Sequence, residues 1–300
     1  MARFPRGSDC PGWVVLVNLD GKQIFAAQIS HGDSHKIILS QSSTEGNHGG
    51  LYRQQLFWPN AAMQVMTRQQ IRRHDQLAIQ ELGIPGVVLM ENAGCHAAQA
   101  VIDLLRKGRK VDPAKAHIAV VCGGGNNGGD GYVIARYLHN VGAIVTLYAA
   151  KDPKSLTGDA LSHFMITQKM GIELVLVTDE AELAGTRGAW DTAHIVVDAL
   201  LGTGFTGQLR PHLAAVIAAC NQARKWQASI VSVDIPSGLD CDTGAGGEAT
   251  VFADLTVTFV APKIGFAQPQ AKAFLGELVV AGIGTPPTLI DRVLAEKVSG

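Results

Sequence analysis

HIAVVCGGGNNGGDG, at residues 117–131, is the stretch from which the architecture of this 300-residue chain follows. Residues 118–121 are apolar and mostly β-branched, which is typical of a strand buried on both faces of a parallel sheet. Glycines and polar residues come next, and apolar residues then recur at helical spacing. A strand, a glycine-rich turn and a helix in this order build an anion site. Glycine lets backbone N–H groups approach a phosphate, and the N-terminus of the helix carries partial positive charge.

The polar residues of this turn point to a ligand. A G-x-G-x-x-G pattern fits residues 123–128, but such a match is weak by itself. Asn126, Asn127 and Asp130 add amide and carboxylate groups that a plain turn does not need. They indicate a polar ligand or a cation at the end of the strand. The alternative is a flexible glycine turn that Asp130 caps.

Strand and helix patterns alternate along the rest of the chain. Short apolar runs predict strands, and helix signals such as the capping-box pair Thr67 and Gln70 stand between or before them. This alternation predicts an α/β domain with a mostly parallel central sheet and helices on both faces. The expected strands span residues 118–121, 144–148, 174–177, 195–197, 230–233, 255–260 and 278–283. The expected helices span residues 67–82, 87–105, 158–170 and 179–184, with two more after Gly131 and from Pro211.

The composition is that of a globular protein. Hydrophobic residues make up 47% of the chain and charged residues 17%. A formal net charge of −1 argues against a broad nucleic-acid footprint. The five cysteines are scattered without a C-x-x-C pair, so neither a zinc site nor a disulfide framework is indicated, and we expect reduced thiols in a cytoplasmic protein. No apolar run has the length of a membrane span, so no membrane partner is expected.

Residues 1–62 differ from the rest of the chain. We expect a poorly ordered N-terminal extension with one short strand near residues 13–17 and a polar, glycine-rich linker at residues 40–50. No long apolar core of a signal peptide follows its first charges. Because Met63 and Met66 stand just before the first clear helix signal, a start codon placed too far upstream is one explanation. Residues 63–300 are expected to form a single domain.

Three predicted strands end in polar or glycine-rich loops, at residues 122–131, 198–207 and 234–240. In open α/β sheets, ligands bind beyond the carboxyl ends of the strands, near the switch in strand order. If these strands are neighbours, their loops share one crevice.

Four side chains of these loops carry the expected chemistry. Asn127, Asp198 and Ser237 offer three oxygen ligands, which suit a hard cation of low charge better than zinc or copper. Asp198 has a second explanation, because an aspartate at a strand end often caps the next loop. Asp234 stands before a Pro-Ser-Gly turn, where a partly desolvated carboxylate of fixed geometry can act as a general acid or base.

Several motifs resemble those of a known family. They are GGNNGGDG at residues 124–131, VDA at 197–199 with GTGF at 202–205, VDIPSG at 233–238, APK at 261–263 and ENAG at 91–94. With them, the chain from about residue 66 to residue 283 resembles the NAD(P)H-hydrate epimerase family. The resemblance implies a Rossmann-like three-layer αβα sandwich, usually homodimeric. It also implies an isomerase of metabolite repair, which interconverts the R and S forms of hydrated NADH and NADPH (NADHX and NADPHX) at carbon 6 of the nicotinamide ring.

The resemblance implies a site residue by residue. Residues 126–130 look like the loop that binds the phosphates of the hydrate, and residues 202–208 look like a second substrate loop. Asp234 is the expected catalytic acid or base. Potassium, one ion per subunit, would be held by Asn127, Asp198 and Ser237. The residues implied to contact the substrate are Asn126, Asn127, Gly128, Gly129, Asp130, Gly202, Thr203, Gly204, Phe205, Thr206, Gly207, Gln208 and Asp234.

One residue and one residue pair have alternatives that the sequence leaves open. Lys263 would lie near the site and orient the substrate or Asp234, or it is a surface lysine beside a proline turn. Glu91 and Asn92 precede an Ala-Gly step that usually marks close helix packing, but they could instead face a ligand.

Two other function classes stay open. Similar domains also serve as non-catalytic nucleotide- or protein-binding modules, although such modules tend to lose the polar loop residues that this chain keeps. An NAD(P)-dependent oxidoreductase would need an acidic residue at the end of the second strand, where Asp152 comes slightly late. The expected partners are the small-molecule hydrate, a second copy of the chain, and a separate ADP- or ATP-dependent dehydratase, because little sequence follows the last predicted strand.

Overall fold

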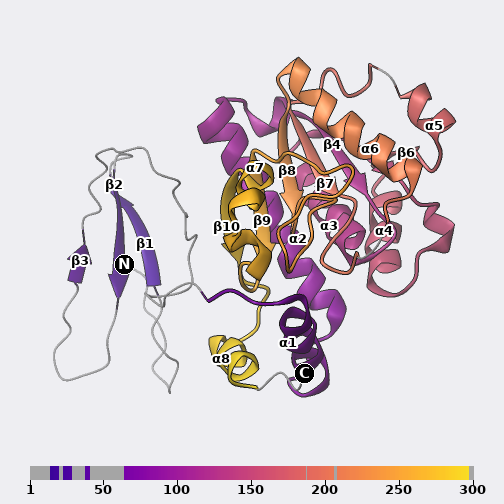
Figure 1. Cartoon of the computed structure of the whole chain (residues 1–300). Coiled ribbons are helices and arrows are strands. Elements are labelled where there is room, and N and C mark those ends of the chain that lie inside the picture. The colour runs from indigo at the N-terminus through magenta and orange to yellow at the C-terminus, as the bar shows by residue number, and fades with distance from the viewer. Residues whose placement is uncertain are drawn as a thin grey trace. The chain divides into compact units, whose positions relative to one another are not determined.

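The computed structural model describes residues 14–19, 23–28, 38–40, 64–186, 188–205 and 208–296 (Figure 1). The chain divides into two compact units, residues 1–49 and residues 50–300. In the first unit, β1 (Val14–Leu19), β2 (Gln23–Gln28) and β3 (Ile38–Ser40) form an antiparallel sheet. The short strand expected near residues 13–17 corresponds to β1, and the expected linker lies, after Ser40, outside the described residues.

The second unit is built on a seven-stranded sheet in the order β10-β9-β8-β7-β4-β5-β6. Every pairing in this sheet is parallel, where the sequence predicts a mostly parallel sheet. The strands are β4 (His117–Cys122), β5 (Ile144–Ala149), β6 (Glu173–Leu176), β7 (Ile195–Ala199), β8 (Ser229–Val233), β9 (Leu255–Phe259) and β10 (Glu277–Ala281). The helices are α1 (Arg68–Gln80), α2 (Gly86–Asp103), α3 (Asn126–Asn140), α4 (Gly158–Lys169), α5 (Glu180–Gly185), α6 (Pro211–Gln222), α7 (Lys272–Leu275) and α8 (Pro287–Ala295). A π-helical turn, Leu104–Arg109, follows α2, and short 3₁₀ turns lie at Pro113–Lys115, Pro153–Ser155, Ala223–Trp226, Ile264–Ala267 and Pro269–Ala271.

Helices cover both faces of this sheet, because its strands are apolar on both faces (Figure 1). Along β4, Ile118 and Val120 belong to the core that α2, α3 and α4 complete. The alternate residues Ala119 and Val121 belong to a second core, which is completed mainly by α6. The alternation follows from the two-residue period of a strand. The three-layer αβα sandwich expected from the sequence is thereby confirmed.

The strand order changes direction beside β4. The chain runs from β4 through β5 to β6 at one edge, returns to β7 on the other side of β4, and continues through β8 and β9 to β10. The switch therefore lies between β4 and β7. The loops that leave these two strands diverge at their carboxyl ends, which is where open α/β sheets bind ligands.

The glycine-rich motif is more helical than the sequence suggests. Asn126 already begins α3, and Gly125 is its N-cap, so residues 126–130 form the first turns of a helix and not a loop. Asp130 lies inside α3 and caps nothing, which corrects the alternative of a turn capped by Asp130. The helix can begin this early because Gly128 approaches the turn closely: a Cβ on Gly128 would lie 2.0 Å from the carbonyl oxygen of Gly123.

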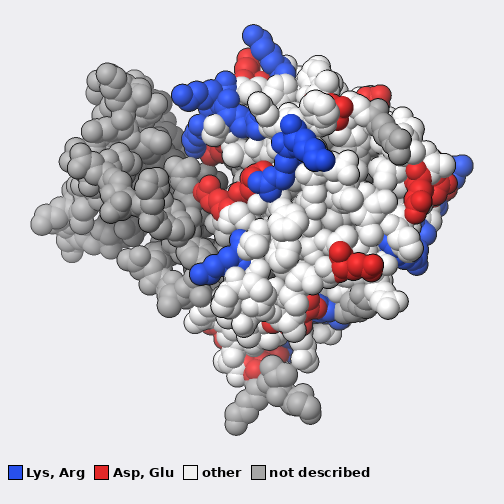
Figure 2. All heavy atoms as spheres, turned by 45° about the horizontal axis from the view of Figure 1, so that its top comes forward, with Lys and Arg blue, Asp and Glu red and all other residues white. Residues whose placement is uncertain are grey.

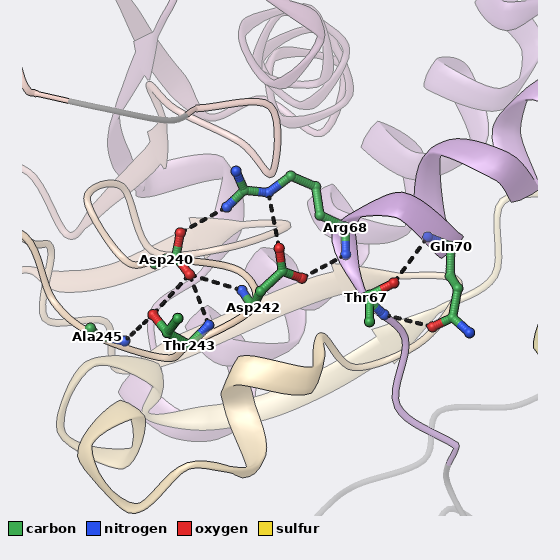
Figure 3. Close-up of polar contacts among 7 residues, drawn as sticks. All are labelled: Thr67, Arg68, Gln70, Asp240, Asp242, Thr243 and Ala245. Atoms are coloured by element: carbon green, nitrogen blue, oxygen red, sulfur yellow. Dashed lines mark hydrogen bonds and ion pairs between the residues drawn. The ribbon is translucent and has the colours of Figure 1, made fainter. Parts of the chain in front are cut away.

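Helix α1 is fixed at its N-terminus by polar contacts (Figure 3). The predicted capping box is confirmed: Thr67 Oγ1 accepts from the backbone N–H of Gln70, and the Gln70 side chain accepts from the backbone N–H of Thr67. Arg68 ties α1 to the loop after β8, because its guanidinium donates to Asp240 at 2.9 Å and its backbone N–H donates to Asp242 at 2.8 Å.

The other end of α1 packs against α8 (Figure 1). Arg73 pairs with Glu296 just after α8, and Arg292 of α8 pairs with Glu81. These pairs are between half-exposed groups, so each contributes little by itself. Together they hold α8 along α1.

Both signs of charge occur on the described surface. On the face that Figure 2 shows, basic and acidic side chains are scattered among uncharged ones. No helix in the described part of the chain is both long and apolar enough to cross a bilayer. Cys95, Cys122, Cys220 and Cys241 are free thiols, and Cys10 lies outside the described residues.

Candidate functional site

A pocket of about 510 Å³ lies at the carboxyl ends of β4, β7, β8 and β9. It gathers residues of all three polar loops, as the sequence predicts for neighbouring strands. The expected site residues that line it are Asn126, Asn127, Asp130, Gly202, Thr203, Gly204, Phe205 and Asp234. Helices α1 and α2 close it with apolar and charged side chains, among them Ile71, Asp75, Leu89 and Met90.

Other predicted site residues in the described part of the chain do not line the pocket. Gly128 and Gly129 face protein atoms, since added Cβ atoms would meet the backbone of Gly123 and the sulfur of Met90. Their local role is close packing of α3. Gln208 does not belong to the pocket lining. Thr206 and Gly207 lie outside the described residues.

Asp198 is the buried anchor beneath the pocket. Its carboxylate accepts from Ser237 Oγ at 2.5 Å, from the backbone N–H of Ser237 and from Ser232 Oγ, each of the last two at 2.9 Å. The backbone N–H of Leu200 adds a longer contact of 3.3 Å. Burial raises the pKa of Asp198, although these hydrogen bonds act in the opposite direction. The contact with Leu200 agrees with the loop-capping explanation, and the contacts with Ser237 join the ends of β7 and β8.

Asn127 reaches the same cluster from α3. Its amide Nδ2 donates to the carbonyl oxygen of Leu201 at 3.0 Å, and Ser237 Oγ lies 3.3 Å from that same carbonyl oxygen. Asn127 Oδ1 is buried and has no hydrogen-bond partner among the described residues. A buried acceptor without a donor is costly unless a ligand satisfies it.

This oxygen cluster fits a monovalent cation. The polar groups that contact the Asp198 carboxylate are hydroxyl and backbone N–H groups, all of them uncharged. A cation bound by Asn127 Oδ1, Asp198 and Ser237 Oγ would satisfy the orphaned amide oxygen and offset the buried charge. Asp198 is the one charged residue of this set, and among the described residues no group of three His, Cys, Asp or Glu side chains could hold a metal ion.

Asp234 projects into the pocket from a sharp turn after β8. Its φ is 66°, and the backbone N–H of Ile235 donates to the carbonyl oxygen of Val233 at 2.8 Å, which closes a three-residue γ-turn around Asp234. The Asp234 Oδ1 atom lies 2.6 Å from Lys263 Nζ and 3.4 Å from Thr258 Oγ1. The side chain of Lys263 is completely buried, so the alternative of a surface lysine is wrong.

Comparisons with known proteins agree with this geometry. The family model described as YjeF-related protein N-terminus matches residues 86–265. The chain belongs to this family. NAD(P)H-hydrate epimerase of Rhodopirellula baltica is 41% identical over 234 residues, which are 78% of this chain and 90% of that protein. The bifunctional NAD(P)H-hydrate repair enzyme Nnr of Moorella thermoacetica is 40% identical over 228 residues, and this chain spans 42% of its length.

One solved structure supports the fold of this YjeF-related domain. The crystal structure of yeast ynu0 superposes with a TM-score of 0.64 and covers 77% of this chain and 93% of the yeast chain. The identity is 22%, so the likeness concerns the fold alone.

Several carboxyl groups of the YjeF-related domain line the same pocket: Asp75, Asp130, Asp159 and Asp234. Asp130, on the second turn of α3, is buried, and its pKa is raised well above the ordinary value. The main cause is burial, and the negative charges of Asp234 and Asp75 add to it, while Lys263 acts in the opposite direction. The pocket therefore holds one carboxyl group that favours its neutral form beside one that is paired with an ammonium group.

The ENAG motif is used for packing. Glu91 accepts from Arg136 and Tyr137 of α3, and Asn92 donates to the carbonyl oxygen of Ile283 at 2.9 Å. A Cβ on Gly94 would lie 2.4 Å from the Cβ of Val133. The packing alternative is confirmed for Glu91, Asn92 and Gly94, none of which lines the pocket, whereas Ala93 of the same motif does.

Sequence reasoning missed several parts of the pocket, among them Asp159 of α4 and the two described next. The first is the wall from α1, where Ile71, Arg72 and Asp75 face the pocket. Their i, i+1 and i+4 spacing in an amphipathic helix carries no signal for which cavity the helix covers. The second is Val260, which lines the pocket from a left-handed backbone position with a φ of 69°. No residue type in the sequence marks that position.

Proposed function

We propose that this chain is an NAD(P)H-hydrate epimerase that interconverts the R and S forms of NADHX and NADPHX at carbon 6 of the hydrated nicotinamide ring. The relative from Rhodopirellula baltica is named NAD(P)H-hydrate epimerase, and this chain covers 90% of that protein's length. The observation that carries the proposal is the placement of Asp234. Its carboxylate, paired with a buried lysine, shares one pocket with the N-terminus of α3.

The pocket offers the parts that the reaction needs. The hydrate carries a hydroxyl group on a carbon next to the ring nitrogen, and inversion requires the hydroxyl or its proton to leave and to return on the other face. Asp234 would move a proton at the hydroxyl oxygen, a role that one positioned carboxylate can fill. The N-terminus of α3 would bind the phosphates through backbone N–H groups. Leu89, Met90 and Phe259 supply apolar surface for the ring.

A potassium ion belongs to the proposal, one per subunit. Asn127, Asp198 and Ser237 would hold it, and the orphaned Asn127 oxygen supports the choice of this place. When bound, the ion would supply positive charge beside the pocket. Our proposal further includes a homodimer, a cytoplasmic location, and a separate ADP- or ATP-dependent dehydratase that consumes one epimer. The bifunctional name of the Moorella thermoacetica relative supports the link to a second repair activity.

The test supplies a mixture of R and S hydrates to a dehydratase that consumes one epimer. The loss of hydrate is followed by absorbance. With the dehydratase alone, consumption should slow sharply when one epimer is exhausted, and adding this protein should let the whole pool disappear quickly. Asp234→Asn should keep the fold and lower the epimerisation rate by about 100-fold or more, the usual effect of a general acid or base. A wild-type protein that leaves the second epimer untouched would refute the proposal.

A further inference from the structure

We propose that Lys263 is the positioning residue of the site: its ammonium group fixes the Asp234 carboxylate in the pocket and holds the turn at Val260 beside it. This inference rests on the proposed function, because it assigns a task to Asp234. It adds a residue to which the sequence patterns give no definite role.

The contacts of Lys263 support a fixed ammonium group. Its side chain is completely buried, and a buried charge persists only where polar partners satisfy it. Lys263 Nζ lies 2.6 Å from Asp234 Oδ1, 3.1 Å from the carbonyl oxygen of Phe259 and 3.4 Å from that of Ala261. An ammonium group has three donors, and these three acceptors account for all of them.

The two carbonyl groups flank a second sharp turn. The backbone N–H of Ala261 donates to the carbonyl oxygen of Phe259 at 2.8 Å, which closes a γ-turn around Val260, whose φ is 69°. A β-branched residue with positive φ is a strained conformation that persists only where its surroundings fix it. Lys263 provides such a constraint, because it binds the carbonyl groups on both sides of Val260.

The same construction occurs on the adjacent strand. Asp234 is the centre of the γ-turn that ends β8, and Val260 is the centre of the γ-turn that follows β9. The two strands pair side by side, and the backbone N–H of Asp234 donates to the carbonyl oxygen of Val257 at 2.7 Å. Both central residues line the pocket. Lys263 contacts both turns, so the loss of its ammonium group removes a contact that they share.

The charges around Asp234 show why the ammonium group matters. Asp130 of α3 and Asp75 of α1 line the same pocket. Cys241 is close enough that the charges of Asp234 and Lys263 both shift the pKa of its thiol. Arg72 of α1 and Asp159 of α4 also line the pocket, so acids outnumber cations there, and Lys263 is the cation whose Nζ lies 2.6 Å from Asp234 Oδ1. Without the ammonium group, the carboxylate would keep its acidic neighbours and lose the cation in contact with it, which favours the protonated form and removes its fixed orientation.

The experiment is a double-mutant cycle with Lys263→Met, Asp234→Asn and the double variant. In the otherwise wild-type background, Lys263→Met should lower kcat about 100-fold with little change in KM, as expected for loss of a correctly placed acid or base. The acid limb of its pH–rate profile should move to higher pH. In the Asp234→Asn background, the same change should lower kcat by less than about threefold, because residues that act through one another are not additive. Lys115→Met, at an exposed lysine before β4, is the matched control and should behave as wild type.

Each outcome decides the matter. An equal loss of kcat in both backgrounds, or an acid limb that stays in place, would overturn the positioning role. If Lys263→Met does not fold, Lys263→Arg, which keeps a cation beside Asp234, is assayed with Lys263→Gln, which keeps a polar side chain without the charge. Activity that Lys263→Arg keeps and Lys263→Gln loses supports the role, and equal activity in the two variants overturns it. A wild-type protein without epimerisation refutes the proposed function, whereas an active wild type with uncoupled variants refutes only the role of Lys263.

Discussion

Replacing Gly128 by alanine tests the close fit between α3 and the turn that precedes it. The new Cβ would lie 2.0 Å from the carbonyl oxygen of Gly123 and 2.7 Å from its carbonyl carbon. Both are backbone atoms, so no side chain can rotate away. The turn cannot retreat freely, because Gly123 is itself close to the backbone of Leu200, whose carbonyl oxygen lies 1.9 Å from where a Cβ on Gly123 would stand. Relief therefore requires a backbone shift of about 1 Å or more, judged from ordinary contact distances.

The expected cost follows from this confinement. Overpacking of a close-fitting interior costs about 1–3 kcal/mol, and we take about 3 kcal/mol because both colliding groups belong to the backbone. For a domain of this size, each kcal/mol lowers Tm by about 2–4 °C, so Gly128→Ala should melt about 6–12 °C below the wild type. The measurement is thermal unfolding followed by circular dichroism.

Gly125→Ala is the matched control from the same motif. A Cβ on Gly125 meets no atom within 4 Å, and its φ of −107° suits any residue. Its only expected cost is that of alanine at an N-cap, about 1 kcal/mol or less. The reasoning would be refuted if Gly128→Ala had the same Tm as the wild type. It would also be refuted if Gly125→Ala lowered the Tm as much as Gly128→Ala does.

Three further predictions concern the pocket and α1. Replacing choline chloride by potassium chloride at equal ionic strength should raise the Tm of the wild type and leave that of Asn127→Ala unchanged; an equal rise in both would contradict the cation site. Asp130→Asn should raise Tm at pH 7.5 and change it little at pH 4. The raised pKa of Asp130 makes the native state bind more protons than the unfolded state, so the wild type loses stability as pH rises above about 4, and a difference in Tm that does not vary with pH would count against this. Thr67→Ala should lower the free energy of unfolding by about 1 kcal/mol in urea titrations through loss of the capping box, while Gln76→Ala, on the exposed face of α1, should change it little.

The fold could be predicted because its signals are local. Each strand buried on both faces appears as an apolar, β-branched run, as residues 118–121 of β4 show. The capping box at Thr67 marks the start of α1 within one residue. The start of α3 was misplaced because glycine and asparagine favour turns in isolation, whereas in the structure the close approach of Gly128 to Gly123 accommodates a helix that begins at Asn126.

Only the features of the site that follow from the geometry of a parallel sheet could be predicted. Parallel strands bring their carboxyl ends to one edge, so the convergence of Asn127, Asp198 and Asp234 follows from strand order. The γ-turn at Val260 could not be predicted, because it depends on contacts between β8 and β9 and on an ammonium group that binds carbonyl groups across the turn. The burial of Lys263 likewise depends on contacts with residues that are distant in the sequence, such as Asp234. A lysine beside a proline can equally well lie at the surface. The residues next to Lys263 in the sequence do not indicate that its side chain contacts Asp234 at the end of β8.

The pairing of α1 with α8 has a consequence for binding. Ile71, Arg72 and Asp75 form a wall of the pocket, yet the helix that carries them is braced on its outer side by Glu296 and by Arg292 of α8. Substitutions that break these ion pairs would let α1 move and would weaken ligand binding. Arg292 and Glu296 are more than 200 positions away in the sequence from their partners Glu81 and Arg73. We therefore expect ligand affinity to depend in part on Arg292 and Glu296, which do not line the pocket.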